Sequence, residues 1–216
     1  MDHRGFHKIH ACAFRLDNTD MVVMMPSKGG KSTILMDMLM DPEVQILSDD
    51  SPVVSRNGHI QPFPLRLGAE VSNDLIKRFP YLQPKDLYSF ERLYYSPKYL
   101  VDIQKIKNKV ASSKAQRQIL LTGVRSTNTH AHCLPIGRLK MLRHLLRHMI
   151  IGMGLPMIIE HFLRSGFKDH LLNVYILFSR FYSAIVLICR SECYEVYLCS
   201  DKMKNRQVLV DLASER

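Results

Sequence analysis

Residues 21–33 read MVVMMPSKGGKST and carry the strongest structural signal of the chain. An apolar run, Met21 to Met25, leads into a glycine-rich turn and then into residues at helical spacing, which predicts strand, turn and helix in that order. Backbone N–H groups of such a turn point inward, and the helix start adds partial positive charge, so the turn is suited to phosphate oxygens. Lys31 is expected to neutralise β- and γ-phosphates, and the Ser32 hydroxyl to reach a magnesium ion.

A second apolar run ends in paired carboxylates, in the sequence ILSDD at residues 46–50. Asp49 and Asp50 would complete the metal site, and one of them could act as a base. Adjacent strand residues point to opposite faces, so both can serve only if the chain turns there, as Ser48 to Pro52 suggests. The alternative is that the glycines only form a tight connection and that Asp49 and Asp50 lie in a solvated turn. Both motif-like features would then have to occur in this order by chance.

The full pattern for a phosphate-binding loop is G-x-x-x-x-G-K-[ST]. Gly30, Lys31 and Ser32 match its second half, and Gly29 adds flexibility. Met25 stands where the first glycine is expected. The turn therefore departs from the pattern at one defined position.

Composition narrows the class of protein. A chain of 216 residues, 46% hydrophobic, predicts one folded domain. The net charge of +10 favours acidic partners such as nucleotides, an acidic peptide or nucleic acid. The five cysteines form no C-x-x-C pair and are expected as reduced thiols. The start, MDHRGFH, lacks an apolar core, so no secretory signal is expected and a cytoplasmic location is predicted.

Two apolar stretches resemble membrane segments. Residues 149–159 are too short to span a bilayer and contain two glycines and a proline. Residues 171–189 are long enough, but Arg180 would place a charge at mid-span, which is costly in lipid. We interpret residues 171–189 as two buried elements joined near Arg180 and expect a soluble protein with no membrane partner.

The remaining elements follow from periodicity and turn signals. Asn57-Gly58 indicates a hairpin. Strands are predicted over residues 9–16, 21–25, 44–47, 52–55, 59–61, 118–124, 183–189 and 194–199. Helices are predicted over residues 33–40, 136–151 and 156–164, short helices and turns over 73–87, and a short apolar segment over 207–212. The lysine-rich residues 97–114 are interpreted as an exposed basic segment.

Residues 10–68 resemble the catalytic core of HPr kinase/phosphorylase and its relatives, a branch of the phosphoenolpyruvate-carboxykinase-like P-loop fold. The resemblance rests on Ile9-His10-Ala11, the turn at 25–33, LSDD at 47–50 and GHIQPFP at 58–64. It implies an α/β fold: a P-loop core at 8–70 with a mixed sheet of the HPr kinase C-terminal domain type, and a helical insertion in the second half. Helical and strand completion over 118–212 would make residues 1–216 a single catalytic domain.

The resemblance implies an ATP-dependent kinase that uses ATP and Mg²⁺ and phosphorylates a serine-type hydroxyl of a peptide or protein. Some relatives in peptide-biosynthesis clusters phosphorylate a serine on a small peptide, which fits this chain at least as well as HPr does. The implied catalytic residues are Asp49, Asp50, Lys31 and His10. The implied nucleotide-binding residues are Ser27, Lys28, Gly29, Gly30, Lys31, Ser32 and Thr33, and the implied metal ligands are Ser32, Asp49 and Asp50.

Two other classes of function stay open. A degenerate P-loop protein could bind nucleotide, or merely keep the fold, and serve as an interaction module; Met25 and the short N-terminal region favour this. The intact Lys31, Ser32, Asp49 and Asp50 favour the enzyme. Nucleic-acid binding rests on charge alone, without a recognised motif, and is not expected. A homo-oligomer is neither indicated nor excluded.

Several polar residues have a structural as well as a functional interpretation. His10 is either a buried structural residue or a group that positions phosphate, and Arg66 and Arg125 are expected on the solvated surface, with phosphate contact as the alternative. The basic residues 98–114 are expected to be solvated, with binding of an acidic peptide as the alternative.

Two histidine spacings resemble metal sites. They are His130-x-His132-Cys133 and His144-x-x-x-His148, and no further cluster in the sequence completes either. We therefore expect no metal at these positions.

Overall fold

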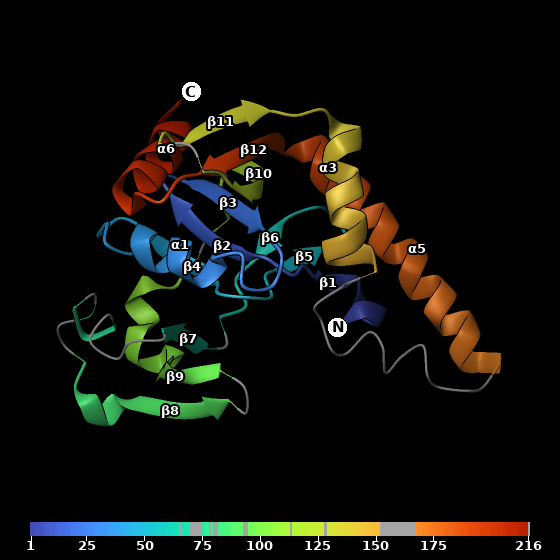
Figure 1. Cartoon of the computed structure of the whole chain (residues 1–216). Helices are drawn as coiled ribbons and strands as arrows, with labels where there is room; N and C mark the ends of the chain where they lie inside the picture. The colour runs from blue at the N-terminus through green and yellow to red at the C-terminus, as the bar shows by residue number, and fades with distance from the viewer. Residues whose placement is uncertain are drawn as a thin grey trace.

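The computed structural model describes residues 1–64, 66–69, 75–77, 79, 82–92, 95–112, 114–127, 129–151 and 167–215. Within them the chain is mixed α/β, as expected, and its largest sheet has six strands in the order β11-β12-β10-β3-β2-β4 (Figure 1). These strands are β2 (Cys12–Leu16), β3 (Thr19–Met24), β4 (Gln45–Ser48), β10 (Arg117–Arg125), β11 (His132–Pro135) and β12 (Glu192–Leu198).

Strand direction brings several chain segments to one edge of this sheet. β10 runs parallel to both β3 and β12. β2 is antiparallel to both β3 and β4, so β4 points the same way as β3. The carboxyl ends of β3, β4, β10 and β12 therefore lie at the same edge, where β2 begins.

Helices cover both faces of the six-stranded sheet because side chains alternate along each strand. In β3, Met21 and Val23 pack in one core cluster with α1 (Lys31–Met38) and α6 (Lys202–Ser214). Val22 and Met24 point the other way, into a cluster with α3 (Arg138–Leu145), the π-helix η4 (Leu146–Ile150) and α5 (Phe167–Arg190). β3 is buried on both faces, which explains its continuous apolar sequence.

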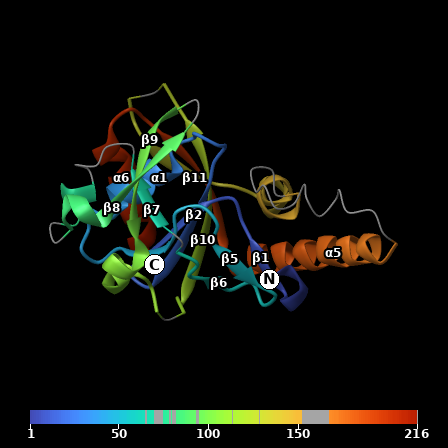
Figure 2. The same cartoon turned by 90° about the horizontal axis from the view of Figure 1, so that it is seen from below.

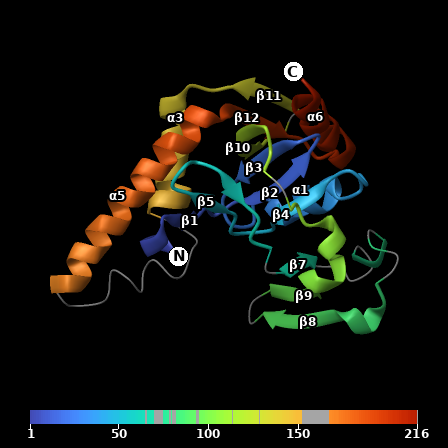
Figure 3. The ribbon, with the colours of Figure 1, turned by 180° about the vertical axis from the view of Figure 1, so that it is seen from behind.

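Two small sheets complete the described chain. One contains β1 (Phe6–Lys8), β5 (Val53–Ser55) and β6 (Ile60–Gln61), and its β5–β6 hairpin confirms the Asn-Gly turn signal. The other contains β7 (Arg66–Ala69), β9 (Tyr95–Asp102) and β8 (Leu87–Arg92), and it lies beyond the β4 edge of the main sheet (Figure 3). The 3₁₀ helices are η1 (Asp2–Arg4), η2 (Pro84–Asp86) and η3 (Ile103–Lys109).

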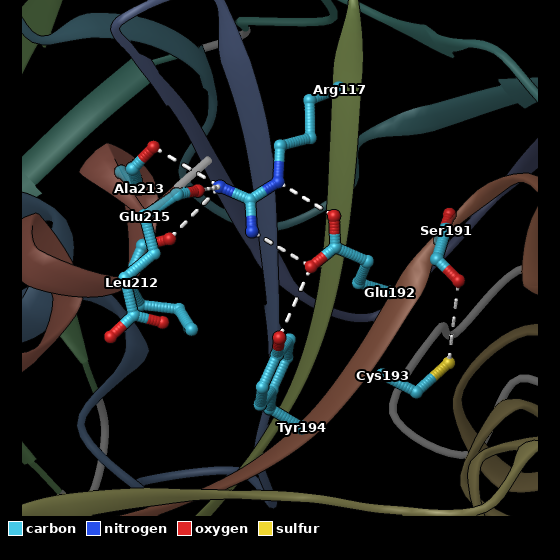
Figure 4. A network of polar contacts seen from close by, with 8 residues as sticks. All are labelled: Arg117, Ser191, Glu192, Cys193, Tyr194, Leu212, Ala213 and Glu215. Carbon is cyan, nitrogen blue, oxygen red and sulfur yellow. Dashed lines mark hydrogen bonds and ion pairs between the residues drawn. The ribbon is translucent and has the colours of Figure 1, made fainter.

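Arg117, at the start of β10, joins the sheet to the end of α6 (Figure 4). Its guanidinium donates two hydrogen bonds of 2.7 Å to the carboxylate of Glu192. A third nitrogen, Nη1, donates to carbonyl oxygens at the C-terminus of α6, those of Leu212, Ala213 and Glu215. Last-turn carbonyls have no partner within their own helix, so this arginine caps α6 and fixes it against the sheet.

The predicted break at Arg180 is wrong, and so is the predicted strand over residues 183–189. α5 runs without interruption from Phe167 to Arg190, and Figure 2 shows it extending away from the main sheet. Arg180 is buried, and its guanidinium donates to Asp2 Oδ1 (2.9 Å) and to the Met149 carbonyl oxygen (2.9 Å). Because the buried charge of Arg180 has these partners, the residue can lie in the middle of a continuous helix.

α5 is apolar on its outward side as well. Exposed large hydrophobic residues occur along much of its length: Leu171, Val174, Tyr175, Leu177, Phe178, Phe181, Tyr182 and Ile185. By length and composition alone, residues 170–190 qualify as one candidate membrane span within the described chain. Core helices of soluble proteins satisfy the same criterion.

Three further sequence predictions have clear outcomes. β9 and η3 occupy most of residues 97–114, where Lys105 and Lys107 are exposed as expected and Lys98 is partly buried. The apolar residues 207–212 belong to α6. The helix predicted for residues 156–164 lies outside the described residues. All five cysteines are described, and none is in a disulfide.

Candidate functional site

The glycine-rich turn, residues 25–33, links the carboxyl end of β3 to the start of α1. Gly30 has a φ of +106°, in the left-handed region where a side chain would be strained, and it caps the helix. The Gly29 amide donates to the Pro26 carbonyl oxygen (2.9 Å) and closes the turn. First-turn N–H groups of a helix lack partners within that helix, so the start of α1 at Lys31 has the geometry of an anion site.

Lys31 is buried and points back across this turn. Its Nζ lies 2.9 Å from His10 Nε2, and it donates to the carbonyl oxygens of Met25 (3.2 Å) and Pro26 (3.3 Å). Burial lowers the pKa of Lys31, whereas the carboxylates of Asp50 and Asp49 oppose this shift. The Lys31 ammonium is thus held beside the turn by neutral partners. A phosphate group bound at the turn would replace these partners with a charged one.

His10 lies in the short connection before β2, rather than on the strand itself. A lysine ammonium only donates, so His10 Nε2 accepts from Lys31 and the ring proton resides on Nδ1. That Nδ1 atom faces Asp50 Oδ1 at 3.7 Å, which is ion-pair range but too long for a hydrogen bond. Burial, and then the Lys31 charge, lower the pKa of His10. His10 therefore lies between the lysine of the turn, to which it is hydrogen-bonded, and one of the paired carboxylates, which it faces without a hydrogen bond.

The predicted turn after β4 is confirmed. The strand ends at Ser48, whose hydroxyl accepts from the amides of Asp50 (3.2 Å) and Ser51 (3.1 Å). The same hydroxyl donates to the Phe63 carbonyl oxygen (3.1 Å). Ser48 thereby bends the chain so that both carboxylates reach one region, Asp49 buried and Asp50 exposed.

Asp49 is the carboxylate best placed for a metal. Burial raises the pKa of Asp49, and the nearby Lys98 ammonium and a hydrogen bond from Ser32 oppose the rise. Its Oδ1 atom is buried and has no hydrogen-bond partner among the described residues. A hard cation such as Mg²⁺ prefers oxygen ligands and needs few from the protein when phosphates supply others. Ser32 and Asp49 thus fit the expected magnesium ligands, although the described residues contain no cluster of three or more acidic, histidine or cysteine ligands.

Three further residues lie at this site: Lys98 and His148, which the sequence did not assign to it, and Arg125, which is exposed as expected. Lys98, from β9, lies 3.6 Å from Asp49 Oδ2. His148, from η4, stacks on His10 with centroids 5.9 Å apart and accepts the His10 amide proton at its carbonyl oxygen (2.8 Å). Arg125, expected on the solvated surface, donates from Nε to the Gly29 carbonyl oxygen (3.1 Å) and so lies across the turn.

A cavity of about 330 Å³ opens next to the turn, beginning at Gly29 and Gly30. It lies between α1, the ends of β10 and β12, and the start of α6. Apolar side chains form part of its wall, and polar ones flank them: Ile34, Met38, Leu198 and Leu209, with Asp37, Ser126, Asn205 and Arg206. Asn205 donates to the Cys199 carbonyl oxygen (2.9 Å) and accepts from its amide (2.8 Å), which fixes the wall at the end of β12.

The structure brings Lys31, Ser32, Asp49, Asp50 and His10 together, as the sequence analysis expected. The other expected nucleotide-binding residues line the same turn, with the side chains of Ser27, Lys28 and Thr33 exposed and Gly29 and Gly30 partly buried. The backbone of Arg66 lies in β7, and its side chain is outside the described part.

The described residues contain no group of three or more histidine, cysteine or acidic side chains that could hold a metal ion, at the two histidine spacings or elsewhere. His132 stacks on Tyr197 with centroids 4.7 Å apart. His144 Nδ1 lies 3.2 Å from the Thr122 hydroxyl, and His148 stacks on His10. Each of these histidines is therefore accounted for by local packing.

No protein-family model matches this chain, and no curated protein matches it at a significant level.

Proposed function

We propose that this protein is an ATP-dependent kinase of the HPr-kinase type, which transfers the γ-phosphoryl group to a serine-type hydroxyl of a peptide or protein. The observation that carries the proposal is the meeting of Lys31, His10, Asp49 and Asp50 at one sheet edge, beside a cavity that begins at the glycine-rich turn. Ligands of open α/β sheets bind outside the carboxyl ends of the strands, which is where these residues gather.

In this proposal the nucleotide occupies the turn and the cavity together. Amides of residues 28 and 30–32 hold the phosphate oxygens, while the Gly29 amide closes the turn. Lys31 leaves the carbonyl oxygens of Met25 and Pro26 to pair with the β- and γ-phosphates. The base and ribose fill the neighbouring cavity, whose 330 Å³ is within the range of small-molecule sites.

The two aspartates divide the remaining tasks. Asp49, buried and hydrogen-bonded to Ser32, would hold magnesium together with that hydroxyl. The ion would supply positive charge against the charge that develops on the phosphate oxygens. Asp50, exposed and next to His10, accepts the proton of the acceptor hydroxyl while the new phosphorus–oxygen bond forms and the bond to the bridging oxygen of ADP breaks. His10 accepts a hydrogen bond from Lys31 and so holds its ammonium beside the turn.

Calorimetric titration with ATP, with and without magnesium, tests this proposal. We expect magnesium-dependent binding by the wild type and its loss in Lys31→Ala. Lys107→Ala, which removes an exposed lysine of η3, is the matched control and should bind like the wild type. No binding by the wild type at millimolar ATP would contradict the kinase proposal and favour an interaction module that keeps only the fold.

Labelled ATP then tests transfer itself. Asp50→Asn should keep ATP binding and lose phosphorylation of serine peptides, because only the proton acceptor is removed. Asp49→Asn should weaken the magnesium dependence of binding. Equal transfer by Asp50→Asn and the wild type would remove Asp50 from the mechanism.

A further inference from the structure

Lys98 is the cation nearest to the metal-binding carboxylate in this structure. Its Nζ lies 3.6 Å from Asp49 Oδ2, and no other cation of the described chain forms an ion pair with Asp49. The Lys98 side chain is 28% exposed and that of Asp49 is 7% exposed, so the pair is shielded from much of the solvent. A contact of this kind is less screened by salt than a surface pair.

The path of the Lys98 side chain is built into the β7–β9–β8 sheet. Gly68 on β7 pairs with Leu100 on β9, two residues beyond Lys98 on the same strand. A side chain at Gly68 would collide with Lys98 Cε and would lie within 2.8 Å of Leu100 Cδ2. The bare backbone at Gly68 therefore leaves the lysine stem a route to Asp49.

The other cation of the site has different partners. Lys31 is turned toward His10 and the carbonyl oxygens of Met25 and Pro26. Asp49 is thus paired by a residue from a separate sheet, some fifty positions later in the sequence, rather than by the lysine of the turn. The ammonium of Lys98 thus lies beside the Asp49 carboxylate, which the proposed function assigns to magnesium binding.

We propose that Lys98 is a positioning residue of this site, whose ammonium holds the Asp49 carboxylate until a divalent cation takes its place. The inference rests on the proposed function, because it uses Asp49 as a metal ligand. Exchange of one cation for another keeps positive charge beside Asp49 in both states. It also links the β7–β9–β8 sheet to occupancy of the metal site, since Lys98 must move when the metal binds.

Manganese titration of the full chain without nucleotide, followed by electron paramagnetic resonance at mildly alkaline pH, tests this inference. Lys98→Met keeps the apolar stem and removes the charge. Removal of a unit charge about 4 Å away is worth about 1 kcal/mol even in water, so Lys98→Met should bind Mn²⁺ at least about fivefold more tightly than the wild type. Lys105→Met is the matched control, because Lys105 belongs to the same basic segment but pairs with Asp86 instead of Asp49. Its Mn²⁺ affinity should equal that of the wild type.

The outcomes separate this inference from the proposed function. Equal Mn²⁺ affinity in wild type and Lys98→Met, weaker binding by Lys98→Met, or no binding by either overturns the role of Lys98. Tighter binding by Lys98→Met that disappears when Asp49→Asn is added supports it. ATP calorimetry decides the kinase proposal independently. Thermal unfolding of Lys98→Met and of Lys98→Gln shows whether each variant is folded, so that a loss of binding is not mistaken for a loss of structure.

Discussion

Met25 and Gly123 form a complementary pair: the methionine side chain fills the space beside the bare backbone of the neighbouring strand. A Cβ atom on Gly123 would lie 2.7 Å from Met25 Cγ and 2.8 Å from Met25 Sδ. Met25 is 1% exposed and belongs to the core cluster on the α1 face of the sheet. The residue that replaces the first glycine of the loop pattern therefore serves packing in the core.

The pair predicts non-additive effects on stability. Gly123→Ala should lower the free energy of unfolding by about 1–3 kcal/mol, because the added methyl group overpacks the contact. In the Met25→Ala background the same change should cost much less, since the colliding atoms are gone. Urea unfolding of the four proteins in this cycle measures the coupling. Simple addition of the two single costs would contradict a direct contact.

The burial of Met25 also predicts its effect on nucleotide binding. Met25→Ala should change ATP affinity by less than about threefold, roughly 0.7 kcal/mol, because the Met25 side chain is buried in the core and does not face the solvent side of the turn. Calorimetry below the unfolding transition measures this. A gain of tenfold or more would mean that Met25 obstructs the phosphate site, and would favour a degenerate loop in the wild type.

Arg125 predicts a contribution to the shape of the turn. Arg125→Gln removes the Nε donor to the Gly29 carbonyl oxygen, and a single hydrogen bond is worth about 0.5–1.5 kcal/mol net. We expect ATP affinity to fall by roughly three- to tenfold while the thermal midpoint changes little, because Arg125 is exposed. Arg143→Gln, on the exposed side of α3, is the control and should bind ATP like the wild type.

His148 predicts a loss of stability in acid. Burial, with the nearby cations or cation-forming groups His10, Lys31 and His144, lowers the pKa of His148 from 6.5 to about 4. The unfolded chain therefore binds more protons between these values, so stability is full above pH 6.5 and is lost as pH falls toward about 4. Because the ring is partly exposed, we expect a contribution of about 1 kcal/mol.

Urea unfolding of the wild type and His148→Gln across this range measures the effect. The variant should lose less stability than the wild type on acidification. An equal loss in both proteins would assign the acid sensitivity to other groups, such as His10, whose pKa burial also lowers.

The pairing of Arg180 predicts that the second residue of the chain is needed for stability. Asp2 Oδ1 accepts from Arg180 Nε (2.9 Å) and lies 2.7 Å from His7 Nδ1. Asp2→Asn leaves the buried arginine without its counter-charge, and we expect a loss of about 2 kcal/mol. Glu43→Gln, an exposed acid, is the control for the change in net charge. A thermal midpoint equal to that of the control would show that Met149 alone satisfies Arg180.

The site could be predicted in part because its main residues lie on local sequence signals. The Gly-Lys-Ser turn and the Ser48 turn are each specified within a few residues, and strand direction then brings them together. Lys98 and His148 gave no such signal, because their contacts with Asp49 and His10 depend on how distant elements pack.

The prediction for residues 183–189 failed because β-branched residues there outweighed a weaker helical signal. Buried positions of α5 recur at helical spacing through Ile176, Arg180, Ala184 and Leu187. Counting Arg180 as an inward position would have revealed this period, but its partner Asp2 lies near the start of the chain. The sequence alone does not show that a charged residue has a distant partner. Such a residue in an apolar stretch therefore indicates the end of an element, even where the helix continues.

The pairing of β3 between β2 and β10 sets a limit on dissection of the chain. The strand that leads into the glycine-rich turn takes half of its backbone partners from residues 117–122. Residues as far along as Leu209 line the adjoining cavity. The first third of the chain, which contains the motifs, is therefore not expected to fold by itself. Without β10 it would expose the unpaired edge of an apolar strand. A peptide that ends before β10 should aggregate rather than bind nucleotide.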